Sequence, residues 1–149
     1  MSTEDNKLIA EFMGYSQPHP KYPTTTYWYK KDFPPLTVLL WDTSWDWLME
    51  VVEKIESDER YDVDILQYGT RITDNQKEIV NNIADISFDK KINHTYDAVV
   101  KFIKLNKIEV LISKLKSADL DGETTQYILE KIGMDYQMYK QLNVKYNNK

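Results

Sequence analysis

The stretch Trp41-Asp-Thr-Ser-Trp-Asp-Trp-Leu-Met-Glu-Val-Val-Glu-Lys-Ile-Glu56 decides the fold, because its three tryptophans lead directly into an amphipathic helix. Thr43 is a suitable N-cap, and Asp46 follows three residues later, where a carboxylate can bond the free amides of the first turn. Apolar residues then repeat at helical spacing, which predicts a buried stripe. That stripe consists of Trp45, Leu48, Met49, Val52 and Ile55.

Composition limits the class of protein. The chain has 149 residues, of which 42% are hydrophobic, enough for one domain or one small domain with an appendage. A net charge of −5 argues against a nucleic-acid partner, and the lack of cysteine excludes disulfides and thiolate chemistry. Residues 1–7 are polar, unlike a secretion signal, and no apolar run approaches the ~20 residues of a membrane span. We therefore expect a cytoplasmic protein with no membrane partner.

The rest of the first 106 residues reads as a mixture of helices and strands. A short helix is predicted at 7–13, with Gly14 as its stop. A β-branched and aromatic strand is predicted at 24–31, and residues 36–41 form a second strand or an extended entry to the central helix. The remaining predictions are strands at 61–68, at 71–73 and at 77–86 (where a helix is the alternative), and a helix capped by Asn93 or Thr95.

Beyond Asn106 the composition becomes uniformly helical in character. Ile108, Leu111, Ile112 and Leu115 form one stripe, Asp121 caps a second helix, and Asp135 caps a third. We therefore predict an α+β fold with a small mixed or antiparallel sheet and two or three helices in residues 1–106. A short three-helix module is predicted to follow in residues 107–149.

Three motifs together resemble a family of small, functionally uncharacterised proteins of tailed bacteriophages. They are KLIAEFMG at 7–14, TSWDWLMEVVEKI at 43–55 and YDAVVKFIK at 96–104. Glu50 stands where that family often has proline. Residues 118–130 and 132–138 resemble another phage-borne helical segment, which looks like an appended module. The resemblance implies a viral origin and a bacterial cytoplasm, but it transfers no site residue.

Catalytic and metal motifs are not found in the sequence. His19 and His94 lie in different segments with no ligand spacing between them, and the Asp119–Gly122 run departs from the pattern of a calcium loop. Ser44 lacks the setting of a catalytic nucleophile, and the four glycines form no phosphate loop. We expect no metal, no cofactor, no catalytic residue and no enzymatic activity.

The aromatic residues carry the candidate site. Residues two apart on a helix diverge by about 200°, so Trp41, Trp45 and Trp47 cannot all share one face. Three interpretations stay open for the rings that are left over, namely core, subunit contact and ligand pocket. In the last, aromatic stacking plus one or two cations holds a nucleotide. The predicted ligand-binding residues are Trp28, Tyr29, Lys30, Trp41, Trp47 and Arg71.

Two functions therefore compete. The first is a non-enzymatic, homo-oligomeric binding protein that sequesters a small anionic nucleotide-type signal of host defence. The second is an adaptor or inhibitor that binds a host defence protein through the same exposed rings or through residues 107–149. Ligand identity, oligomeric state and host target are not fixed by the sequence.

Overall fold

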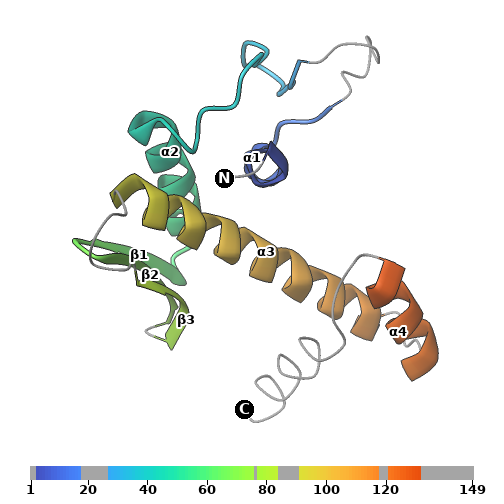
Figure 1. The fold of residues 1–149 in the computed structure, drawn as a ribbon. Coiled ribbons are helices and arrows are strands. Elements are labelled where there is room, and N and C mark those ends of the chain that lie inside the picture. Colours follow the sequence, from blue (N-terminus) through green and yellow to red (C-terminus); the bar gives the residue numbers. More distant parts are fainter. Residues whose placement is uncertain (1–2, 18–26, 76, 84–90, 118–120, 132–149) are drawn as a thin grey trace. The chain divides into compact units, whose positions relative to one another are not determined.

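The computed structural model describes residues 3–17, 27–75, 77–83, 91–117 and 121–131 (Figure 1). Its elements, in chain order, are α1 (Thr3–Phe12), α2 (Trp45–Glu56), β1 (Tyr61–Leu66), β2 (Gly69–Asp74), β3 (Lys77–Ile83), α3 (Lys91–Ser117) and α4 (Gly122–Lys131). The chain forms two compact units, Met1–Asn106 and Lys107–Lys149. The predicted α+β fold with a helical C-terminal module is confirmed.

The central helix begins at Trp45, and its buried stripe is formed by Leu48, Val51, Val52 and Ile55. Two details of the prediction are wrong. Thr43 does not cap the helix, since Ser44 occupies the N-cap position and the Thr43 hydroxyl contacts the Leu40 carbonyl at 3.4 Å. Trp45 is 37% exposed, because it is the first helical residue and the core contacts begin one turn later.

The three strands form one antiparallel sheet in the order β1-β2-β3. A two-residue turn at 67–68 places Asp64 opposite Arg71. Asn75 turns the chain from β2 toward β3 with a φ of 49°, a left-handed conformation that asparagine tolerates better than most residues. The strand predicted at 77–86 is confirmed as far as Ile83, and its last three residues lie outside the described part of the chain.

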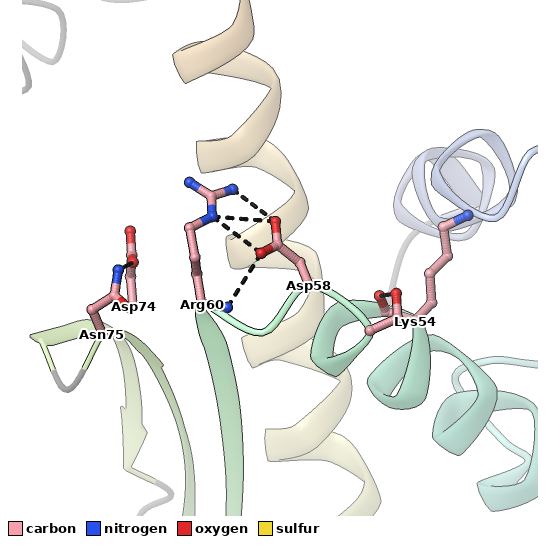
Figure 2. A network of polar contacts seen from close by, with 6 residues as sticks. Lys54, Asp58, Arg60, Asp74 and Asn75 are labelled. Carbon is pink, nitrogen blue, oxygen red and sulfur yellow. Dashed lines mark hydrogen bonds and ion pairs between the residues drawn. The ribbon is translucent and has the colours of Figure 1, made fainter.

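The turn between α2 and β1 is fixed by a short-range ion pair (Figure 2). The guanidinium of Arg60 donates from Nη2 to Asp58 Oδ2 at 2.7 Å and from Nε to Oδ1 at 3.1 Å, while the Arg60 backbone amide also donates to Asp58. These hydrogen bonds hold the pKa of the Asp58 carboxyl below its usual range. The Ser57 hydroxyl donates to the Lys54 carbonyl at 2.6 Å, which closes the last turn of α2.

Helix α3 packs on the sheet through a buried polar chain. Thr95 donates its hydroxyl hydrogen to the Lys91 carbonyl at 2.9 Å. Because a hydroxyl has one hydrogen, Thr70 must be the donor in its 2.9 Å contact with Thr95. Thr70 must then accept a hydrogen bond from His94 Nδ1, also 2.9 Å away. The network therefore places a proton on Nδ1 of His94, which is 1% exposed.

Aromatic and polar contacts join α1 to α3. Phe12 meets Phe102 edge-on with ring centroids 6.3 Å apart, and the Tyr96 hydroxyl donates to Asn6 at 3.1 Å. Lys104 and Asp5 form an ion pair of 2.8 Å across the same contact. Helix α1 begins at Thr3, four residues before the predicted start.

The strand predicted at 24–31 is not formed in its described part. Residues 24–26 lie outside the described residues, and from Tyr27 onward the backbone makes only two isolated bridges, Ser16 with Tyr29 and Trp28 with Leu36. The second bridge closes a tight turn in which the Phe33 amide donates to the Lys30 carbonyl and Asp32 has a φ of 66°. Prolines at 34 and 35, which cannot donate to a ladder, prevent this turn from growing into a hairpin.

Helix α3 continues without interruption through Asn106 to Ser117 (Figure 1). The prediction of a separate helix after residue 106 is therefore wrong, because asparagine is only mildly unfavourable inside a helix and neither proline nor glycine follows it before residue 118. The predicted cap of the next helix is confirmed, since the Thr124 amide donates to Asp121 Oδ1 at 2.7 Å. The helix predicted after Asp135 lies outside the described residues. Within the described chain, no helix is both long and apolar enough to cross a bilayer.

Candidate functional site

The structure gathers five side chains into an aromatic and cationic group that we name the Trp41 cluster: Tyr15, Lys30, Phe33, Trp41 and Trp47. At its centre Trp41 is 2% exposed. Trp47, from the first turn of α2, meets it edge-on with 5.2 Å between ring centroids. Tyr15, from the segment that follows α1, packs on Trp41 with 6.4 Å between ring centroids. Trp47 and Tyr15 are both half-buried, so the cluster runs from the core to the surface.

Lys30 supplies the positive charge of the cluster. Its ammonium lies 4.3 Å from the ring centroid of Phe33 and 5.4 Å from that of Tyr15. The backbone sets this position, because the bridge between Ser16 and Tyr29 brings the two segments together. The side chain of Lys30 also crosses Gly14, where a Cβ would come 3.8 Å from Lys30 Cε. Among the described residues Lys30 forms no ion pair, and its ammonium lies over the two ring faces instead.

Charges of opposite sign act on Tyr15. The pKa of the Tyr15 hydroxyl is raised, first by burial and then by the negative charge of Glu50. Lys30 approaches the face of the same ring. An anionic group would therefore be favoured close to the Lys30 ammonium and disfavoured close to the Glu50 carboxylate.

Trp41 adds a polar atom to this otherwise apolar centre. Its indole Nε1 is buried, and no described residue accepts a hydrogen bond from it. A buried donor without an acceptor costs about 1–3 kcal/mol, so such groups are rare in folded proteins. The donor lies on a residue that contacts both half-exposed rings of the cluster, Tyr15 and Trp47.

The structure sorts the six predicted site residues into three groups. Lys30, Trp41 and Trp47 belong to the Trp41 cluster. Trp28 is 7% exposed and lies in the core, while Tyr29 is half-buried and forms a backbone bridge with Ser16. Arg71 is bound elsewhere, since its guanidinium pairs across the sheet with Asp64 at 2.7 Å.

Sequence reasoning missed Tyr15 and Phe33. Both are brought to Lys30 by single backbone bridges and a tight turn, features that leave no periodic signal in the sequence. Gly14 was the available clue, because its φ of 89° turns the chain sharply after α1 and directs residue 15 away from the helix axis.

Arg71 lines a separate acidic hollow of about 520 Å³ along the sheet. Its lining contains this one guanidinium and four carboxylates, those of Glu56, Asp62, Asp64 and Glu78. In the described part of the chain, no three acidic or histidine side chains are placed to hold a metal ion. The hollow therefore differs in charge from the Trp41 cluster and does not extend it.

No family model, no curated protein and no solved structure matches the chain. The assignment of a function therefore rests on the chemistry of the side chains. The Trp41 cluster offers ring faces, one cation and one buried N–H donor, which are groups that proteins use to bind aromatic and anionic ligands.

Proposed function

We propose that this chain is a non-enzymatic binding protein that holds a small anionic ligand with a planar ring at the Trp41 cluster. The observation that carries the proposal is the position of Lys30. Its ammonium lies over the rings of Tyr15 and Phe33 and forms no ion pair with a described residue. A phosphate or carboxylate would gain a charge-assisted hydrogen bond there, while the ring of the same ligand stacks on Phe33, which is 51% exposed.

The free donor on Trp41 supports the same ligand class. A nucleobase or a sugar oxygen that reached Nε1 would satisfy an atom that otherwise has no acceptor among the described residues. A nucleotide-type ligand combines the three required groups, a ring, an anion and several acceptors.

The resemblance of the motifs in residues 7–106 to phage-encoded proteins suggests the biological role. A viral protein that binds a nucleotide tightly and leaves it intact would withdraw a signal of host defence. We propose sequestration of this kind, in the cytoplasm of an infected bacterium, by an oligomer of the chain.

Thermal unfolding in the presence of a ligand panel tests the proposal. The panel contains cyclic nucleotides and ADP-ribose-type compounds, and the mass of the protein is fixed by light scattering. A ligand at 100 times its dissociation constant should stabilise one site by about 2.7 kcal/mol. Chromatography of the recovered ligand then decides the class, since an unchanged ligand means sequestration and a changed one means an enzyme. A panel without any shift would refute ligand binding of this class.

A second candidate function is favoured by a specific observation on residues 33–45. Apolar side chains are exposed along this segment, including Val38 at 57%, Leu40 at 38% and Trp45 at 37%. Exposed large apolar groups close together in the chain are typical of protein interfaces. Such a surface fits an adaptor or inhibitor of a host protein. Val38→Ser would weaken binding of the host protein and leave nucleotide binding unchanged. Lys30→Gln would weaken nucleotide binding and leave binding of the host protein unchanged.

A further inference from the structure

The outer edge of β1 presents backbone groups that no described strand pairs with. The strand order β1-β2-β3 leaves β1 at the border of the sheet. The amide of Tyr61 donates to the Asp58 carbonyl, and the amide of Val63 donates to a side chain, so both point away from β2. Because every second residue of a strand points the same way, the amide of Ile65 faces this edge too.

Glu56 covers part of that edge. Its Oε1 accepts the hydrogen bond from the Val63 amide at 3.1 Å, in place of a neighbouring strand. The Glu56 side chain is exposed at the end of α2, so water can replace this bond at low cost. The contact is thus a removable cap on the strand edge. Once Glu56 is displaced, the stretch from Val63 to Leu66 can pair with an added strand.

The charge beside this edge selects the kind of partner. The acidic hollow is lined by Glu56, Asp62, Asp64 and Glu78, with Arg71 as its one cation. Arg71 is already engaged by Asp64, and Asp62 forms no ion pair with a described residue. A strand added beside β1 would set its own alternate residues next to Asp62 and Asp64, where lysine or arginine is favoured. Its other residues would lie beside Val63 and Ile65, where apolar side chains fit.

We propose that the β1 edge binds an extended segment of a partner protein that alternates basic and apolar residues, by adding it as a fourth strand. Pairing of β1 with the β1 strand of a second copy is disfavoured, because it would bring Asp62 and Asp64 against the same carboxylates. This inference is independent of the Trp41 cluster and stands or falls separately from the proposed function.

A labelled peptide, acetyl-Lys-Val-Lys-Val-Lys-Val-amide, tests the inference on the full chain by fluorescence anisotropy. Two N-methylated forms provide the control for strand pairing, one methylated on the lysine amides and one on the valine amides. Only one set of amides can face β1, so one form should lose affinity by about ten-fold or more and the other should keep it. Equal binding of both forms, or no binding of the parent peptide, would overturn the proposal.

Two pairs of variants separate the edge from general charge attraction. Glu56→Gln and Glu56→Ala both remove the charge, but only glutamine keeps an acceptor for the Val63 amide. We expect Glu56→Ala to bind the peptide several-fold more tightly than Glu56→Gln. Asp62→Asn should weaken binding, while Asp46→Asn, at an exposed carboxylate in the first turn of α2, should not. Equal affinities within both pairs would contradict strand addition at this edge.

Discussion

The indole of Trp47 meets the indole of Trp41 edge-on, with 5.2 Å between the ring centroids and 67° between the ring planes. This contact joins the buried core to the half-exposed side chains of the candidate site, and the packing of Tyr15 on Trp41 extends it. The rings of this group therefore have unequal roles. The buried ring of Trp41 supports the structure and offers a ligand only its Nε1 donor, whereas Trp47 and Tyr15 also expose part of their rings.

Replacement of Trp41 and of Trp45, a tryptophan outside the cluster, should show how much stability depends on the burial of Trp41. Trp41 is 2% exposed and Trp45 is 37% exposed. Trp41→Ala should cost about 3–5 kcal/mol of unfolding free energy, because it leaves a large cavity. Trp45→Ala should cost about 1 kcal/mol or less, as a change at the surface. Urea unfolding measures both values, and comparable losses at the two positions would mean that the assigned burial is wrong.

The ionisation of Tyr15 should depend on Glu50. Burial and the Glu50 carboxylate both raise the pKa of Tyr15, and burial is the larger cause. Glu50→Gln should therefore lower this pKa but leave it above the ordinary value for tyrosine. The difference in alkaline ultraviolet absorbance between the protein and its Tyr15→Phe variant isolates the one hydroxyl. An unchanged midpoint in Glu50→Gln would place the carboxylate too far away to matter.

The fold was predictable where the pattern is periodic. Leu48, Val52 and Ile55 were expected on the buried face of α2 and are found there. Periodicity does not show that the core ends before Trp45, because Trp45 has the same helical spacing as the buried residues. The change of composition after Asn106 predicts that a helix ends there, but a single asparagine inside α3 carries only a small helical penalty.

The candidate site was predictable only in part, because its members come from irregular segments. Lys30 and Trp41 were identified from residue type. Tyr15 could not be connected to them, since one backbone bridge from Ser16 to Tyr29 makes that contact. Arg71 was included for its charge, but the two-residue turn after β1 sets it opposite Asp64, and the ion pair follows from that register.

The buried polar chain between β2 and α3 should matter for stability. Thr70→Val removes the partner of His94 and of Thr95, and both of those residues are buried. We expect a loss of about 1–3 kcal/mol of unfolding free energy, the usual cost when a buried polar network loses one of its hydrogen-bonding members. Thr73→Val, on the same strand but facing the acidic hollow, is the matched control and should change little. The same network also fixes the tautomer of His94. The ¹⁵N NMR shifts of its imidazole should place the proton on Nδ1, and a proton on Nε2 alone would refute the inferred network.

Helix α4 should fray in acid through Asp121. The Thr124 amide donates to this carboxylate, and backbone hydrogen bonding lowers its pKa in the folded state. The stabilisation is therefore complete above the ordinary pKa of aspartate, about 3.9, and is lost as the pH falls through the lowered folded value. Chemical shifts of Gly122 to Thr124 against pH measure this. Asp121→Asn keeps a cap but should abolish the dependence, and persistence of the same transition in that variant would assign it to another group.

Comparison of Lys30→Gln with Lys31→Gln tests the central claim most directly. Both variants remove one positive charge from neighbouring positions, but only Lys30 lies over the rings of Tyr15 and Phe33. The readout is the affinity for the nucleotide that stabilises the protein most in the ligand panel. We predict that Lys30→Gln loses about ten-fold or more of that affinity, as expected for one charge-assisted hydrogen bond, while Lys31→Gln stays close to the unmodified protein. Equal affinities in the two variants would contradict a ligand site at the Trp41 cluster.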